Sequence, residues 1–197
     1  MIKGYSTELS LFIMGEKSLG KTHLLLAFCH QMSCLNLKTA YLPLKEIASY
    51  HLPQCFQELE TFDVIAIDDI ELIAGNFLAE EKVFYLFNEM VAKQKYFLAT
   101  SQFHMQNISF SLKDLSSRLK SVLCYQLKSP EDEDKLSVIQ SITNKRGLKI
   151  SQETLKYILY HHSRDMESLI TLIHQLDEIS LRERQKISIS FVKKWIN

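Results

Sequence analysis

The sequence is poor in the residues that interrupt regular structure, and it has no excess of charge. Its 197 residues include five glycines, three prolines and one tryptophan, and 23 basic residues balance 23 acidic ones. A net charge of zero excludes a broad electrostatic surface for nucleic acid or anionic lipid. No apolar run approaches the roughly 18 residues of a membrane-spanning helix, and no signal-peptide pattern opens the chain, so we expect a cytoplasmic protein without membrane contact.

The cysteines form no C-x-x-C pair, so neither a zinc site nor a disulfide framework is expected. Their neighbours are apolar, and we predict four reduced, buried thiols: Cys29, Cys34, Cys55 and Cys124. With 46% hydrophobic and 23% charged residues, the composition is that of a globular protein, and the length allows a core of ordinary size.

Two of the five glycines stand in one segment, "GEKSLGKT" at residues 15–22. The segment fits the pattern G-x-x-x-x-G-K-[ST], in which loop N–H groups and a helix N-terminus surround phosphates. A strand pattern enters it and a helical pattern leaves it, which is the order this chemistry requires. Lys21 is expected to reach the β- and γ-phosphates, and Thr22 to contact Mg²⁺. We predict that the whole segment binds a nucleotide: Gly15, Glu16, Lys17, Ser18, Leu19, Gly20, Lys21 and Thr22.

Two adjacent carboxylates end the apolar segment "DVIAIDDI". Parallel strands present ligand-binding groups at their carboxyl ends, and a P-loop site uses an acid there to hold Mg²⁺. We therefore assign Asp68 to the metal. We place Asp69 on the γ-phosphate side, where it would orient an attacking water as a catalytic residue. A solvated turn after a strand is the alternative interpretation of this pair.

The first two thirds of the chain alternate short apolar runs with helical patterns, which is typical of an α/β fold with a parallel sheet flanked by helices. We predict strands at 9–14, 39–44, 63–68, 96–101 and 122–127. Helices are predicted to begin near Lys21, Leu44, Ala79 and Leu112. In the third of these helices an apolar stripe predicts a buried face: Val83, Leu86, Phe87 and Met90.

After residue 128 the pattern becomes mainly helical. Ser129 is a candidate N-cap with Pro130 at the first helical position, and Gly147 suits the end of that helix. Ser151 is a candidate cap for the next helix. A later segment carries an apolar stripe: Leu169, Leu172, Ile173 and Leu176. We therefore divide the chain into a nucleotide-binding core, 1–128, and a small all-helical subdomain, 129–197.

Several segments together resemble the DnaA family of AAA+ proteins. Those similar to the ATPase core of the family are "LFIMGEKSLGKTHLL", "DVIAIDDIELIAG" and "ATSQ". Those closer to its Hda branch are "LKDLSSRL", "SPEDEDKL", "ITLIHQLDEIS" and "ISISFVKKWI". The resemblance implies a P-loop AAA+ core followed by a helical lid. Residues 15–22 would be the Walker A motif, and Asp68 with Asp69 the Walker B motif.

The resemblance also implies roles outside the P-loop, with two departures. Arg118, in "SSRL", matches the arginine finger that reaches a neighbouring subunit's ATP; pairing on a helix surface is the alternative. Ser101 falls at sensor 1 as a nucleotide contact, but the family there usually reads "SD", and this chain has Gln102. At sensor 2 the expected arginine is replaced by Glu167. Arg164, one turn earlier, is the candidate substitute for binding the nucleotide.

The function that the resemblance implies is regulation of replication initiation. Such a protein binds ADP or ATP with Mg²⁺, meets DnaA through the face that carries Arg118, and stimulates hydrolysis of DnaA-bound ATP. Its own turnover is expected to be slow, because Gln102 and Glu167 weaken two groups that sense the γ-phosphate. Two alternatives stay open: a helicase-loading ATPase, as in the DnaC and IstB relatives, and a degenerate scaffold that binds no nucleotide.

Further expectations concern partners and the ends of the chain. The Hda branch carries a peptide for the DNA polymerase sliding clamp, and "ELSLF" at 8–12 is close to it, but the same residues are expected to form the strand before the P-loop. A homo-oligomer is left open. The chain stops at Asn197, so we expect no DNA-binding domain of the DnaA kind. Fourteen residues precede Gly15, so the adenine side is expected to be short or incomplete.

Overall fold

The computed structural model describes residues 9–47, 51–162 and 165–196. The chain forms two compact units, Met1–Lys128 and Ser129–Asn197. In the described ranges, no helix is long and apolar enough to cross a membrane.

The first unit is built on a five-stranded sheet in which all neighbouring strands are parallel, with the order β2-β3-β4-β1-β5. Its strands are β1 (Ser10–Met14), β2 (Thr39–Pro43), β3 (Val64–Asp68), β4 (Tyr96–Ser101) and β5 (Leu123–Gln126). All five lie within the segments predicted from the sequence, and the α/β prediction is confirmed. Because β1 and β3 flank β4, the P-loop segment and the paired acids leave the same carboxyl edge of the sheet.

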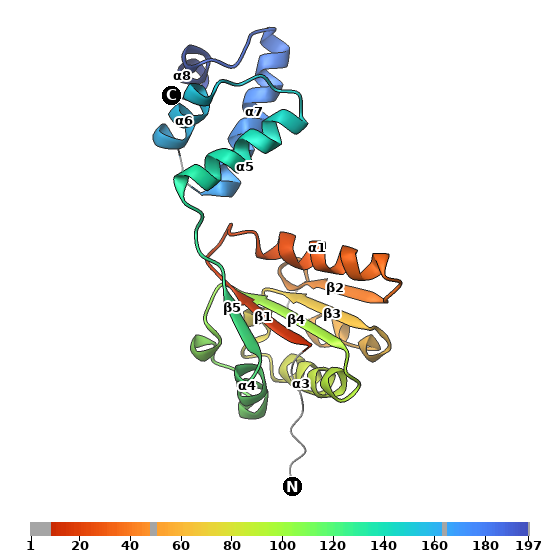
Figure 1. Ribbon diagram of the computed structural model, residues 1–197. Helices are drawn as coiled ribbons and strands as arrows, with labels where there is room; N and C mark the ends of the chain where they lie inside the picture. The colour runs from red at the N-terminus through yellow and green to blue at the C-terminus, as the bar shows by residue number, and fades with distance from the viewer. Residues whose placement is uncertain (1–8, 48–50, 163–164, 197) are drawn as a thin grey trace. The chain divides into compact units, whose positions relative to one another are not determined.

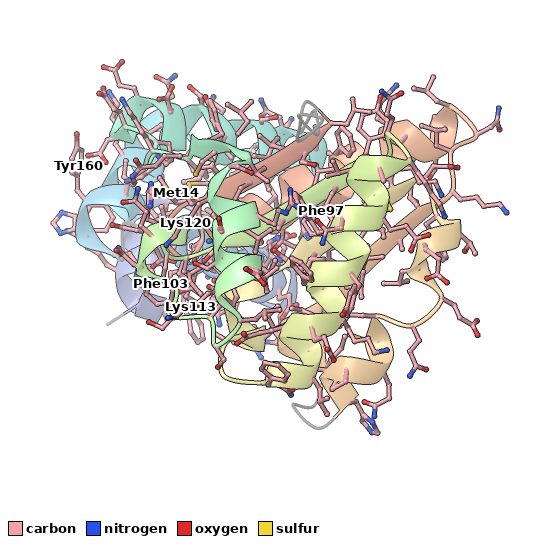
Figure 2. All side chains as sticks on the ribbon, turned by 90° about the horizontal axis from the view of Figure 1, so that it is seen from below. Met14, Phe97, Phe103, Lys113, Lys120 and Tyr160 are labelled. Carbon is pink, nitrogen blue, oxygen red and sulfur yellow. The ribbon has the colours of Figure 1, made fainter. Side chains whose placement is uncertain are left out.

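Helices cover both faces of this sheet. α1 (Lys21–Cys34) lies on one face, and α3 (Phe77–Ala92) and α4 (Lys113–Lys120) lie on the other (Figure 1). α3 and α4 contact each other, and Figure 2 shows them side by side again. The connections contain short helical pieces: η1 (Leu44–Glu46), α2 (Leu52–Cys55), η3 (Leu59–Thr61), η4 (Ile70–Ile73) and η5 (Met105–Asn107).

The strand β3 lies between β2 and β4 and is buried along its whole length. Its side chains alternate between two apolar clusters. Val64 and Ala66 pack in a cluster with Leu25 of α1, while Ile65 and Ile67 belong to the cluster on the α3 side. A strand covered by helices on both faces must be apolar throughout, which explains the unbroken run in the sequence. The stripe predicted for α3 is confirmed, because its four members are buried: Val83, Leu86, Phe87 and Met90.

A helical piece begins at Leu44, as predicted, but it is the short 3-10 helix η1. The chain becomes extended again at Ile47, which ends the piece. α2 starts separately, with Pro53 in its first turn. A proline suits that position because the first helical N–H groups have no intrahelical acceptor.

The other helix starts of this unit also lie close to the prediction. α3 begins at Phe77 rather than near Ala79, because the Asn76 side chain caps it by accepting a hydrogen bond from Ala79 N at 3.2 Å. The starts predicted near Lys21 and Leu112 are confirmed.

The second unit contains α5 (Asp132–Lys145), α6 (Gln152–His161), α7 (Met166–Glu183) and α8 (Ile189–Ile196). Their apolar faces meet in one cluster that includes the predicted stripe of α7, Leu169, Leu172, Ile173 and Leu176. The Ser151 cap is confirmed, since its Oγ accepts from Thr154 N at 3.2 Å. Gly147, at φ 73°, follows the end of α5 as predicted.

The predicted start of α5 is wrong. Its N-cap is Glu131, so Ser129 and Pro130 precede the helix. Glu131 has the extended backbone that is usual for an N-cap residue, with φ −69° and ψ 165°, and the helix begins after it. The observed start places the acids at 132–134 in the first turn, where they interact favourably with the positive end of the helix dipole.

The four thiols are free but differ in exposure. Cys29 is buried and Cys55 half-buried, whereas Cys34 and Cys124 are exposed, so the prediction of buried thiols is wrong for these two. Cys34 is the last residue of α1, and Cys124 lies on the edge strand β5, whose four residues are all exposed. Burial raises the pKa of Cys55 to about 11.

Candidate functional site

The P-loop segment joins β1 to α1 and has the backbone of an anion-binding loop. Ser18 and Gly20 have positive φ values of 65° and 84°, so the chain turns sharply before α1 begins. Gly20 is the N-cap of α1 and has no side chain to cap it, and the first turn contains no acid. The N–H groups at the start of α1 therefore face the loop without a side-chain acceptor from these positions, an arrangement that favours a bound anion.

Gly15 stands where the chain leaves β1 and is closely surrounded. A Cβ atom at this position would lie 3.1 Å from Leu127 Cβ and 3.2 Å from Leu19 Cδ1. Its N–H donates to Ser101 O at 3.1 Å, and Leu127 N donates to Met14 O at 2.7 Å. Close packing explains why glycine is required at the first fixed position of the motif.

Lys21 supplies a buried cation inside the loop. The side chain is 6% exposed, and its Nζ donates to Gly15 O at 2.7 Å and to Glu16 O at 2.8 Å. Both acceptors are neutral carbonyl groups of the loop. A buried ammonium held in this way favours a nearby anion, because desolvation leaves its charge incompletely compensated.

Asp68 is the centre of a hydrogen-bond cluster at the end of β3. It is 5% exposed, and its Oδ2 accepts from Thr22 Oγ1 at 2.6 Å and from the Tyr41 hydroxyl at 3.0 Å. Its Oδ1 accepts from Thr100 Oγ1, which in turn accepts from Asp69 N at 3.0 Å. The two residues assigned to the metal, Thr22 and Asp68, are thus brought into direct contact.

Asp69 differs from its neighbour in backbone and environment. Its φ of 57° lies in the left-handed region, which aspartate tolerates better than most residues, and it precedes η4 as the N-cap. Partial burial and the neighbouring Asp68 carboxylate raise the pKa of Asp69, while Lys21 and Lys45 oppose the shift. The side chain is half-buried, so it can accept a proton or orient a water only at the rim of the cluster.

The segment after β4 uses its polar groups locally. Ser101 is completely buried, and its Oγ accepts from Phe103 N at 2.9 Å. Gln102 is exposed, and its backbone N–H donates to Glu71 Oε1 at 2.9 Å. The role predicted for Ser101 at the nucleotide stays a prediction, because a hydroxyl that accepts one hydrogen bond can still donate another.

The remaining predicted site residues lie on other elements. Arg118 is exposed in the last turn of α4, on the face of the sheet opposite α1 (Figure 1). Glu167 is exposed in the first turn of α7, in the second unit. Arg164 lies outside the described residues. The clamp-like peptide begins at Glu8, also outside them, and its residues 10–12 lie in β1, where the strand prediction is confirmed.

Two residues of the Asp68 cluster were missed in the sequence. Thr100 stands next to the carboxyl end of β4, a position where polar residues of a parallel sheet meet at one edge, and that position is the signal that could have identified it. Tyr41 is the middle residue of β2 and contacts Asp68 through its hydroxyl, so its position in the strand gave no such signal. Burial raises the pKa of Tyr41, and Asp68 adds to the shift, so the tyrosine hydroxyl stays a protonated donor.

The site fits a nucleotide and Mg²⁺ in its chemistry. The turned loop, the open start of α1 and buried Lys21 suit phosphates, and the Thr22–Asp68 pair supplies the oxygen ligands that Mg²⁺ prefers. When bound, Mg²⁺ would neutralise charge on the phosphate oxygens. The sheet order, the loop between β1 and α1, the acids after β3 and the separate helical unit together define a P-loop protein of the AAA+ type.

The family models agree with this class. Residues 6–128 match the bacterial DnaA ATPase domain, and residues 132–196 match the Hda lid domain. The chain therefore belongs to the DnaA family of AAA+ proteins, in its Hda-like branch, and is a replication-associated protein. The family predicted from the sequence motifs is confirmed.

Relatives and solved structures extend the comparison. An uncharacterized protein of Haemophilus influenzae is 36% identical over 188 residues, which cover 94% of this chain and 80% of that protein. Domain III of Thermotoga maritima DnaA has a TM-score of 0.80 at 20% identity, with 95% of this chain and 85% of that chain covered.

Longer initiator structures share the fold over part of their length. AMPPCP-bound DnaA from Aquifex aeolicus has a TM-score of 0.72 at 18% identity, with 85% of this chain and 55% of that chain covered. A DNA replication initiation factor has a TM-score of 0.71 at 20% identity, with 89% and 58% covered. The chain thus spans little more than half of these two proteins.

Proposed function

We propose that this chain is a regulator of replication initiation that binds ADP or ATP and stimulates the hydrolysis of ATP held by DnaA. In this proposal residues 15–22 and Asp68 hold the nucleotide with Mg²⁺. Arg118 is then the group that acts on the ATP of the partner. The chain's own nucleotide fixes a conformation and is turned over slowly.

The position of Arg118 is the observation that carries the proposal. It is exposed on α4, whereas the chain's own phosphate loop leads into α1 on the opposite face of the sheet. An arginine presented in this way is placed to meet a neighbouring molecule. A guanidinium on a transferring phosphoryl group stabilises its charge and is worth ~10³ to 10⁵ in rate.

Slow turnover is supported by the segment after β4. The position after Ser101 is the amide Gln102 instead of the carboxylate that the family resemblance implies, and its backbone N–H donates to Glu71 Oε1. In the second unit, Glu167 carries a negative charge where the family resemblance places a phosphate-binding arginine. Each change weakens recognition of the γ-phosphate and leaves the loop at 15–22 intact.

The direct test measures hydrolysis of DnaA-bound ATP with the wild-type chain, with Arg118→Ala and with Lys120→Ala. Lys120 is an exposed cation on the same helix and serves as the matched control. We expect Arg118→Ala to lower the stimulated rate by ~10²-fold or more, and Lys120→Ala to retain it. Equal stimulation by all three proteins would refute the assigned role of Arg118.

A calorimetric titration distinguishes this proposal from the two alternatives. We expect the titration to show binding of ADP or ATP in the presence of Mg²⁺. If neither nucleotide gives a heat of binding, the chain is a scaffold that binds no nucleotide. An ATPase activity of the chain alone that rises with single-stranded DNA would instead favour a helicase loader. Under our proposal single-stranded DNA leaves its slow turnover unchanged.

A further inference from the structure

One fully buried carboxylate has no part in the nucleotide site. Glu80 is 0% exposed and lies in the first turn of α3. Its Oε1 accepts from Gly75 N at 2.8 Å, and its Oε2 accepts from Leu112 N at 2.6 Å. Burying a carboxylate is costly unless it is hydrogen-bonded, and here both oxygens accept from backbone N–H groups of different segments.

The two segments held by Glu80 are the ones that matter for the proposed function. Gly75 closes the stretch that starts at Asp69 and passes through η4, and its positive φ of 84° marks a turn. Leu112 is the N-cap residue of α4, the helix that carries Arg118. A single side chain of α3 therefore links the segment after the acid pair to the start of the arginine-bearing helix.

The other contacts of α4 with this unit's core are apolar. Leu115 and Leu119 are buried in the cluster on the α3 side of the sheet, and Leu112 packs against it partly buried. Apolar contacts are non-directional, so they resist withdrawal of a helix more than sliding or rotation. The side chain of Leu112 cannot accept a hydrogen bond, so the N-cap residue supplies no cap of its own. In Figure 2, Lys113 and Lys120 mark the two ends of this short helix.

We propose that Glu80 is a positioning residue, which fixes the start of α4 relative to η4 and thereby sets where Arg118 is presented. This rests on the proposed role of Arg118 in stimulating a partner's hydrolysis. Displacement of a catalytic group by about 1 Å can cost ~10²-fold in rate, so an anchor six residues before the arginine can control activity without contact to either nucleotide.

Two variants disrupt the link between Gly75 and Leu112 from opposite sides. Glu80→Gln keeps the size of the side chain, but its carbonyl oxygen can accept from one N–H group while its NH₂ faces the other. Leu112→Pro removes the donor and leaves the carboxylate and the Gly75 contact in place. Glu81→Gln changes the same charge on the same helix at a position that is only half-buried, and serves as the control.

The first readout is hydrogen exchange of the amides in segment 113–119, which requires no partner. We expect both bond-breaking variants to accelerate exchange at the start of α4 by ~10-fold, because an opening free energy of about 1.4 kcal/mol is lost. Glu81→Gln should exchange like the wild type. If both variants unfold at the wild-type temperature and the amides of α4 exchange at the wild-type rate, Glu80 does not fix the start of α4.

The second readout is stimulation of DnaA-bound ATP hydrolysis. We expect Glu80→Gln to lower the maximal stimulated rate by ~10-fold or more, with the half-saturating concentration of the chain nearly unchanged. Combined with Arg118→Ala, it should cause no further loss, since both changes act through one group. Full stimulation by both Glu80→Gln and Leu112→Pro would overturn the positioning role. A wild-type chain that gives no stimulation would refute the proposed function instead, and the exchange measurement would still decide whether Glu80 fixes α4.

Discussion

The two sides of the candidate site use their polar groups in opposite ways. On the P-loop side, groups from separate elements converge: Lys21 donates to the loop carbonyls, and Asp68 accepts from Thr22 of α1. After β4, Ser101 and Gln102 are engaged by neighbouring backbone and by Glu71. Under the proposed function, the contrast makes holding a phosphate and sensing the terminal phosphate separable properties of one sheet edge.

This separation has a physical basis. A phosphate grip needs a fixed cation and oriented N–H groups, which the start of a helix supplies whether or not a reaction follows. Hydrolysis also needs groups aimed at charge that develops in the transition state. Where the second set is committed to local hydrogen bonds, the first can still hold a nucleotide as a structural element.

The largest expected effect comes from removing the buried cation. Lys21→Ala should weaken binding of ADP and ATP by ~10²-fold or more, because a desolvated charge pair with the phosphates is lost. Titration calorimetry measures the change, and Lys82→Ala, at an exposed position on α3, serves as the control. If the Lys21 variant and the wild type bind the nucleotides with equal affinity, Lys21 does not bind the phosphates as proposed.

The next effect concerns the metal. Removal of Mg²⁺ with EDTA should weaken nucleotide binding by the wild-type chain, and Asp68→Asn should reduce that dependence on Mg²⁺. Loss of a group that orients a metal ligand typically costs ~10- to 100-fold in metal affinity. Binding isotherms at several Mg²⁺ concentrations test this, and an unaltered Mg²⁺ dependence in the variant would contradict the assignment of Asp68.

Tyr41→Phe should have a smaller effect on the same cluster. The hydroxyl that donates to Asp68 Oδ2 at 3.0 Å is lost, which should lower the free energy of unfolding by about 1 kcal/mol. Nucleotide affinity should fall by less than ~10-fold, and only when Mg²⁺ is present. Tyr85→Phe, at an exposed tyrosine of α3, controls for the loss of a phenol in denaturant unfolding. If the nucleotide affinity falls by the same factor without Mg²⁺, Tyr41 does not act through the metal.

The smallest effect on binding is expected after β4. Ser101→Ala should lower the free energy of unfolding by about 1 kcal/mol, since the hydrogen bond from Phe103 N is lost. The ratio of ATP to ADP affinity should change by less than ~3-fold. A larger loss of affinity that affects ATP but not ADP would show that the Ser101 hydroxyl contacts the γ-phosphate. The two sides of the site would then not differ in the way described.

Much of the fold could be predicted because its periodicities are strong. The apolar strands and the stripe of α3 follow directly from burial on the two faces of the sheet. The short connections were harder, since the end of η1 depends on the extended backbone of one residue, Ile47, which no sequence pattern marks. Cys34 and Cys124 were wrongly predicted to be buried, because apolar neighbours do not reveal that a residue lies at a helix end or on an edge strand.

The candidate site divides in the same way. The P-loop and the acid pair are local motifs, so spacing alone indicates them. Tyr41, Thr100 and Glu80 act through contacts between residues far apart in the sequence. Such contacts depend on strand order and helix placement, which no local pattern specifies.

The crowding at Gly15 has a mechanical consequence for the end of the first unit. The glycine lies against Leu127, and Leu127 N donates to Met14 O at 2.7 Å, so the start of the predicted phosphate loop and the end of the first unit are held together. The first unit ends one residue later, at Lys128. A larger side chain at Gly15 would therefore displace the last residues of the first unit as well as the loop.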